Sequence, residues 1–171
     1  MGTAKAEHNL TKLFAALAIC LFVGYIDLYF FTSSIPDWYS NLVVPAFVPP
    51  VTDLFYGIIV MAVLLALSLY CILKDNLNKH DARMSSILFT FGLALNVLWF
   101  YTFFYFRSIF MALMVMIMVL TMLACMIYQT LRSTVISSVF LVPYLIIMLL
   151  AAYANLQIVL LNPNLPIWGN F

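Results

Sequence analysis

The sequence predicts an all-α integral membrane protein, and two observations lead to that fold class. The first is composition: 67% of the residues are apolar and 8% are charged, whereas a soluble domain is about half apolar and about a quarter charged. The second is a series of apolar runs, each close to the roughly 20 residues that a helix needs to cross a bilayer. Because these runs lack the alternating pattern of a membrane β-barrel, we predict one helical membrane domain over residues 1–171.

Five runs qualify as transmembrane helices, and they cover residues 13–31, 54–73, 87–106, 109–128 and 135–161. The first follows basic residues, as a signal peptide does, but it contains Asp27 and ends without a small-residue cleavage site, so we expect a retained helix. Only Arg107 and Ser108 separate the third run from the fourth. Together these two runs are too long for one span, so the chain must turn there.

The basic residues predict an orientation in the membrane. Arg107 lies on one side of the predicted bundle, and the other basic residues lie on the side of the N-terminus: Lys5, Lys12, Lys74, Lys79, Arg83 and Arg132. By the positive-inside rule, the N-terminus is cytoplasmic and the C-terminus lies outside, in a membrane that the sequence does not identify. The net charge of +1 gives no indication of nucleic-acid binding.

The first loop is rich in proline and aromatic residues. Pro45, Pro49 and Pro50 fix the backbone and remove hydrogen-bond donors, so this segment does not form a regular helix. Two interpretations fit the residues. Trp38 and Phe47 could belong to an aromatic belt at the membrane interface, or the loop could fold back as a cap over a cavity among the helices.

Three of the polar residues within the predicted spans are candidates for a functional role, and each also has a structural alternative. Asp27 is costly in lipid and therefore a functional candidate, although it lies near the end of its run, where it could reach the interface. Asn96 shares a helix side with Trp99 and could anchor a ligand or join two helices. Asn155 shares a face with Tyr144 and Ala151 and allows the same two interpretations.

Patterns for enzyme chemistry or metal binding are not visible. His8 and His80 lie in polar segments without metal-ligand spacing, and no nucleophile is placed beside a base. We therefore predict no catalytic residues, no metal and no cofactor.

The first loop reads IPDWYSNLVVPAFVPP and resembles the loop pattern WY-x-x-L-x-K-P-x-[FW]-x-P-P of the TspO/MBR family, the translocator proteins or tryptophan-rich sensory proteins. LALNVLWFYTFF is similar to the family's third-helix pattern L-x-x-N-x-x-W-x-x-x-F-F. VPYLIIMLLAAYANL is similar to its fifth-helix pattern, and Leu161 with Asn162 also fits. The motifs occur in the family's order.

The resemblance implies a five-transmembrane-helix bundle in which the proline-rich first loop caps an internal pocket. It implies lipophilic partners: tetrapyrroles such as porphyrin or haem, bound as ligands rather than cofactors, or sterols, together with membrane lipid and a second copy of the chain in a homodimer. The matching motifs assign ligand contact to Trp38, Tyr39, Pro45, Phe47, Pro49, Asn96, Trp99, Phe103, Tyr144, Ile147, Ala151 and Asn155.

The sequence also departs from the family pattern. Val44 replaces the loop lysine, and Thr52, Ile58 and Ile147 stand where the family has tryptophans. Lost indoles weigh against the porphyrin-degrading photo-oxidation proposed for some members. We therefore expect a receptor or transporter-like binding protein. A porphyrin-degrading enzyme and a divergent homologue with a structural or partner-binding role are the alternatives.

Overall fold

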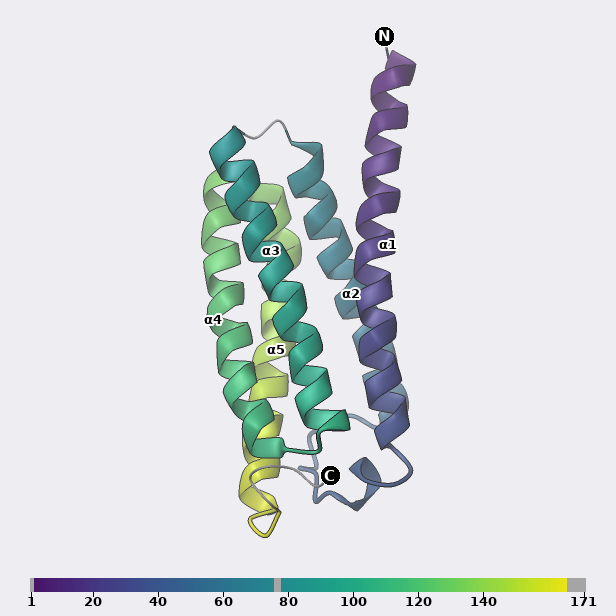
Figure 1. The fold of residues 1–171 in the computed structure, drawn as a ribbon, viewed down its shortest axis with the longest axis vertical. Helices are drawn as coiled ribbons and strands as arrows, with labels where there is room; N and C mark the ends of the chain where they lie inside the picture. The colour runs from purple at the N-terminus through teal and green to yellow at the C-terminus, as the bar shows by residue number, and fades with distance from the viewer. Residues whose placement is uncertain (1, 76–77, 166–171) are drawn as a thin grey trace.

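The computed structural model describes residues 2–75 and 78–165, and the described part contains five helices long and apolar enough to cross a membrane (Figure 1). This confirms the predicted five-helix fold. The elements are α1 (Gly2–Ser34), the 3-10 turn η1 (Tyr39–Asn41), α2 (Val51–Lys74), α3 (Lys79–Phe100), the π-helical turn η2 (Tyr101–Tyr105), α4 (Ile109–Ser133) and α5 (Val135–Leu161).

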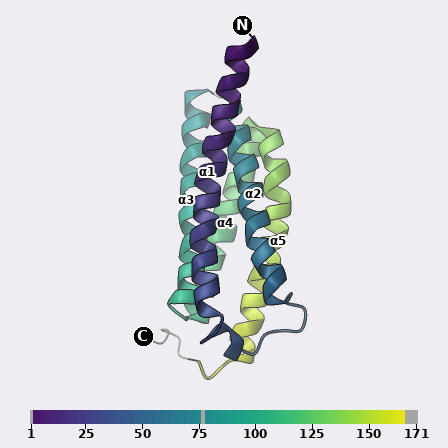
Figure 2. The ribbon, with the colours of Figure 1, turned by 90° about the vertical axis from the view of Figure 1, so that its right-hand side faces the viewer.

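The helices form an elongated bundle with their axes nearly aligned (Figures 1 and 2). Helix α1 packs mainly against α2, α4 packs against both α3 and α5, and α2 also contacts α5. The N-terminal part of α1 extends beyond the other helices (Figure 1). The loop between α1 and α2, the turn between α3 and α4, and the end of α5 all lie together at the opposite end of the bundle (Figure 1).

Several helices extend past the predicted apolar runs. Helix α1 begins at Gly2 rather than residue 13, and α3 begins at Lys79 rather than residue 87. The reason is that hydropathy marks only the part of a helix that lipid can surround, whereas backbone hydrogen bonding continues into polar residues. Asn78 caps α3 by accepting a 2.8 Å hydrogen bond from the Asp81 amide.

Small residues bring α1 and α2 close together. A Cβ atom built on Gly24 would lie 2.8 Å from the Cβ of Ala62, which is closer than two carbon atoms tolerate. Helices α2 and α5 are joined instead by polar contacts, because the Ser68 and Ser137 hydroxyls lie 2.7 Å apart. The Ser137 hydroxyl also lies 3.1 Å from the Ser68 carbonyl. Both kinds of contact are typical of helix association in membranes.

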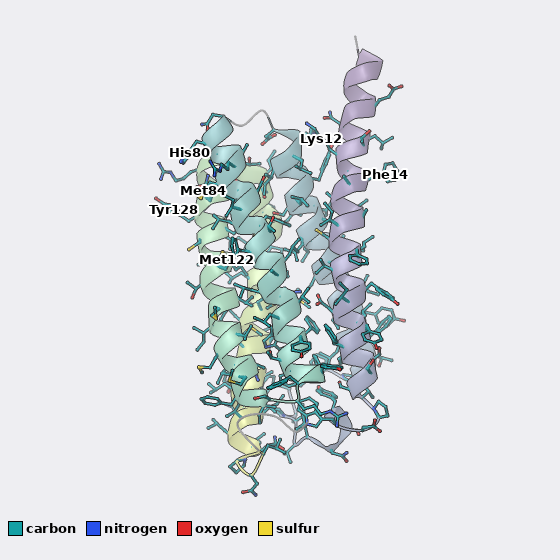
Figure 3. The ribbon with its side chains drawn as sticks, viewed as in Figure 1. Lys12, Phe14, His80, Met84, Met122 and Tyr128 are labelled. Atoms are coloured by element: carbon teal, nitrogen blue, oxygen red, sulfur yellow. The ribbon has the colours of Figure 1, made fainter. Side chains whose placement is uncertain are left out.

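The outer surface of the bundle is apolar over the spans. Phe14, Phe22 and Tyr25 on α1 are 62%, 64% and 66% exposed, and Figure 3 shows Phe14 pointing away from the other helices. Such exposure in water would be unfavourable, at about 25 cal/mol per Å² of apolar surface. The same surface is compatible with lipid chains, so the bundle is a multi-pass integral membrane protein.

Helix α3 reaches α4 through an irregular turn. Its last residues widen into the π-helical turn η2, and Arg107 then adopts a left-handed backbone with φ of 56°. Ser108 caps α4 by accepting a 3.3 Å hydrogen bond from the Met111 amide. The left-handed residue lets the chain reverse within two positions, as the sequence predicted for the short Arg107-Ser108 connection.

Candidate functional site

A cavity of about 330 Å³ lies beneath the first loop. Its walls come from Phe31, from the loop, from the first turns of α2, from the end of α3 with η2, and from the middle of α5. The lining is almost entirely apolar, with Asp53 as its one charged side chain among the described residues. This volume is at the lower end of the range for small-molecule sites, about 300–1,000 Å³.

The structure brings five of the predicted ligand-contact residues to this cavity. They are Phe47, Pro49, Trp99, Ile147 and Ala151. Phe47 and Pro49 come from the loop, Trp99 from α3, and Ile147 and Ala151 from α5, so three segments far apart in the sequence converge here. The five residues surround one apolar cavity, and their contact with a ligand stays a prediction.

Two anchors hold the loop over the cavity. The Asn162 side chain accepts a 3.0 Å hydrogen bond from the Val43 amide and donates a 2.9 Å hydrogen bond to the Val43 carbonyl. Phe47 stacks on Tyr153 of α5, with ring centroids 5.2 Å apart. Pro45 lies in the turn between these anchors, where its carbonyl accepts a 3.0 Å hydrogen bond from the Val48 amide.

Three other predicted residues form an aromatic cluster that supports the loop. Trp38 packs edge-on against Phe103 at a centroid distance of 5.4 Å, and Trp99 lies 5.5 Å from the same ring. Tyr39 contacts Phe104 at 5.9 Å. Burial raises the pKa of the Tyr39 phenol above its ordinary value, so the hydroxyl stays protonated at neutral pH. Trp38, Tyr39 and Phe103 lie next to the cavity wall rather than in it.

A buried polar network crosses the centre of the bundle. The Asn96 amide of α3 donates a 2.6 Å hydrogen bond to Oδ2 of Asp27 in α1, and the Tyr144 hydroxyl of α5 donates a 3.0 Å hydrogen bond to Oδ1 of Asn96. All three residues are buried. Asp27 therefore faces the protein interior rather than the interface. Asn96 joins two other helices through both ends of its amide, and its predicted role as a ligand anchor stays a prediction.

Asn155 holds a different position. Its amide donates a 3.2 Å hydrogen bond to the Ile109 carbonyl at the start of α4, and only 1% of the residue is exposed. This contact ties α5 to the α3–α4 turn. The Asn155 side-chain oxygen is buried without a hydrogen-bond partner in the described part of the chain.

Asp53, Gly57 and Met61 also line the cavity, and the sequence did not single them out. Their spacing of four places them on one face of α2, directly after the Pro49-Pro50 pair. This regular spacing is the signal by which the sequence could have identified the three residues as one helix face. A Cβ atom built on Gly57 would meet no atom within 4 Å, so the absence of a side chain here leaves open space in the cavity wall.

The site offers apolar contact and stacking rather than bond-making chemistry. Within the described residues, no three His, Cys, Asp or Glu side chains are placed to share a metal ion. Trp99 contributes the one polar group that calls for a partner: its indole N–H is buried and unpaired in the part of the chain that the structure describes. A buried donor without a partner is unfavourable, and the indole nitrogen is covered by protein atoms rather than exposed to the cavity.

Comparison with known proteins agrees with this architecture. The model of the TspO/MBR family matches residues 16–161. A protein named Tryptophan-rich protein TspO from Chlorobaculum tepidum is 26% identical over 159 residues, which cover 92% of this chain and 99% of that protein. A protein of the same name from Archaeoglobus fulgidus is 31% identical over 96 residues, which cover 56% of this chain and 61% of that protein's length.

Proposed function

Because the chain belongs to the TspO/MBR family, we propose that it is a receptor or transporter-like membrane protein that binds a lipophilic ligand in the cavity beneath its first loop. The ligand class that we favour is a tetrapyrrole, such as a porphyrin or haem precursor, and a sterol is the second class. The cavity lining supports this proposal because flat apolar molecules bind mainly by burying surface and stacking on aromatic rings.

The observation that carries the proposal is Trp99. Its ring lines the cavity, and its buried N–H has no partner in the described residues. A flat ligand would stack on this ring, and it would reach the N–H only if the ring turned toward the cavity. Lysine and arginine are missing from the described cavity lining, so affinity would come mainly from apolar contact and stacking. It should therefore depend little on salt.

The same lining favours binding over catalysis. Ile58 and Ile147 line the cavity at two positions where the family has tryptophans, so Trp99 is the one indole in the described wall. We further propose the orientation given by the basic residues, with the N-terminus cytoplasmic and the first loop outside, and a homodimer as in the family.

A cavity-filling variant tests the proposal. Purified protein would be titrated with protoporphyrin, followed by porphyrin absorbance, and compared with Gly57→Leu, which places a side chain in the open space of the cavity. Saturable binding to the wild type that is lost in Gly57→Leu supports the proposal. Equal binding to both proteins, or no saturable binding to folded wild type, would refute a tetrapyrrole site in this cavity. Titration with a sterol then tests the second ligand class.

A further inference from the structure

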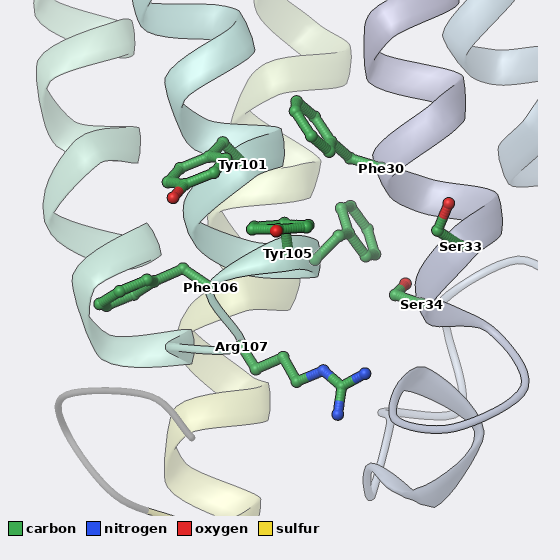
Figure 4. Close-up of a pocket in the computed structure, with 8 residues that line it drawn as sticks. Phe30, Ser33, Ser34, Tyr101, Tyr105, Phe106 and Arg107 are labelled. Atoms are coloured by element: carbon green, nitrogen blue, oxygen red, sulfur yellow. The ribbon is translucent and has the colours of Figure 1, made fainter. Parts of the chain in front are cut away.

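A second hollow lies outside the cavity, between the end of α1 and the α3–α4 turn. It has a volume of about 620 Å³ and is lined by Phe30, Ser33 and Ser34 of α1 and, from the other side, by residues of η2 and the turn that follows it: Tyr101, Phe104, Tyr105, Phe106 and Arg107. We refer to it as the Arg107 groove. Figure 4 shows the aromatic rings at one end of this groove and the Arg107 side chain reaching toward the α1 side at the other.

The groove combines an apolar aromatic surface with one charged side chain just beyond it. Phe30, Tyr101 and Tyr105 belong to the ends of helices that can span the membrane, which finish at Ser34 and Tyr105. Arg107 follows just past that boundary. An apolar aromatic surface therefore lies where the spans end, and a cation follows where the phosphates of a surrounding bilayer would lie.

Arg107 supplies the charge without a partner of its own. Its guanidinium makes no ion pair or hydrogen bond with the described residues, and it is the one charged group that lines the groove. The serine hydroxyls are already engaged, because Ser33 donates to the Tyr29 carbonyl at 2.6 Å and Ser34 donates to the Phe31 carbonyl at 2.8 Å. The groove therefore offers the five N–H donors of one arginine to an anion.

Backbone geometry gives an independent reason to assign a role to this side chain. Arg107 has φ of 56°, a conformation that glycine adopts at lower cost than any residue with a Cβ. The residue directly follows the π-helical turn η2, and such turns frequently mark functional sites. The two irregularities together place an arginine where glycine would suffice for the turn alone.

The ring arrangement favours a flexible ligand over a flat one. Tyr101 and Tyr105 stack on each other at 5.2 Å, while Phe30 meets Tyr101 at an interplanar angle of 72° and Tyr105 at 55°. The rings thus fill the space between themselves and leave no parallel slot for a macrocycle. An acyl chain adapts to such an uneven surface. Tyr105 is 60% exposed, which leaves the groove accessible from the lipid side.

We propose that the Arg107 groove is a binding site for one anionic phospholipid, whose phosphate pairs with Arg107 and whose acyl chain lies along Phe30, Tyr101 and Tyr105. A guanidinium binds phosphate through two parallel hydrogen bonds, which a lysine ammonium does not reproduce. A bound lipid here would join the end of α1 to the α3–α4 turn.

Native mass spectrometry of the full chain tests this site. The protein would be titrated with phosphatidylglycerol or with phosphatidylcholine of the same acyl chains, in neutral detergent, and compared with Arg107→Gln and Arg107→Lys. We expect one retained phosphatidylglycerol, about tenfold weaker retention in Arg107→Gln, and an intermediate value in Arg107→Lys. Phosphatidylcholine should be retained weakly by all three proteins.

Arg132→Gln is the matched control. Arg132 lies over a tyrosine ring, 5.6 Å from the Tyr128 centroid. It belongs to the last turn of α4, whereas the groove lies beside the turn before α4, and it does not line the groove. Equal losses in Arg107→Gln and Arg132→Gln, or equal retention of both lipids by the wild type, would overturn the proposal. Displacement of the lipid by millimolar inorganic phosphate would also overturn it, because the acyl chain would then contribute nothing. Thermal unfolding of each variant, measured in parallel, separates lost binding from lost folding.

Discussion

The carboxylate of Asp27 and the amide of Asn96 lie 2.6 Å apart, although 69 residues separate them in the chain. Without Asn96, the Asp27 carboxylate would be buried with no hydrogen-bond donor among the described residues. Tyr144 extends the contact to α5 through its 3.0 Å hydrogen bond to Asn96. Three helices, α1, α3 and α5, are therefore joined by one small network.

This pairing leads to a prediction about coupling. Asn96→Ala should destabilise the protein by about 1–3 kcal/mol, because it leaves the Asp27 carboxylate buried without a donor. Asp27→Asn keeps an acceptor oxygen for the Asn96 amide and should be tolerated better than Asp27→Ala. Unfolding in mixed micelles would measure each variant, and the Asp27→Ala, Asn96→Ala double-mutant cycle should give a coupling of about 0.5–2 kcal/mol. Additive effects would show that the contact contributes no stability.

We predict opposite effects on stability when alanine replaces glycine at two positions. Gly24→Ala forces a Cβ to within 2.8 Å of Ala62, so α1 must move away from α2 and stability should fall by about 1–3 kcal/mol. Gly57→Ala meets no atom within 4 Å and lies inside α2, so helix propensity should raise stability by up to about 1 kcal/mol. Thermal unfolding of the two variants measures whether stability falls in Gly24→Ala and rises in Gly57→Ala. A loss of stability in Gly57→Ala would contradict the open space at this position.

Asn162→Ala should release the loop. The substitution removes both hydrogen bonds to Val43, so the Val43 amide should exchange with deuterium faster, by roughly tenfold for a local loss of about 1–1.5 kcal/mol. Asn164→Ala is the control, since that side chain has the same chemistry and forms no hydrogen bond with the described residues. Hydrogen-exchange mass spectrometry of the loop peptides would detect the difference. Similar exchange in both variants would mean that other contacts hold the loop.

Trp99→Phe removes the indole N–H but keeps an aromatic ring, so it tests the N–H by itself. The apo protein loses a buried donor that has no partner in the described residues, so its stability should change little despite the smaller ring. Protoporphyrin affinity should fall about five- to tenfold if the ligand accepts that hydrogen bond. Trp38→Phe is the control, because Trp38 does not line the cavity. Equal affinities of the wild type and Trp99→Phe, measured by porphyrin absorbance titration, would exclude the N–H as a contact.

The sequence predicted the five helices because lipid imposes a length and an apolarity that a hydropathy window detects directly. It also predicted the loop, since prolines exclude a helix at Pro45, Pro49 and Pro50. Trp99 and Phe47 were assigned to one site through motif resemblance, and the structure places both at the same cavity.

The remaining features depend on contacts between distant residues. Nothing local in the sequence pairs Asp27 with Asn96 or Asn162 with Val43, because each polar residue had several geometrically acceptable partners. Gly57 was missed for a related reason: its spacing from Asp53 and Met61 indicates a shared helix face, but the open space beside it is not evident until the neighbouring helices are placed. The π-helical turn η2 was also not predicted, since residues 101–105 continue the apolar run without interruption.

The double hydrogen bond between Asn162 and Val43 has a mechanical consequence. It fixes one end of the loop, and the first turn of α2 at Val51 fixes the other. Phe47 lies midway between these points, and a segment of this length reaches at most about 13–14 Å from either end when fully extended. While both ends hold, the loop can swing but not unfold outward, so the widest opening above the cavity is bounded by the contour length of a few residues.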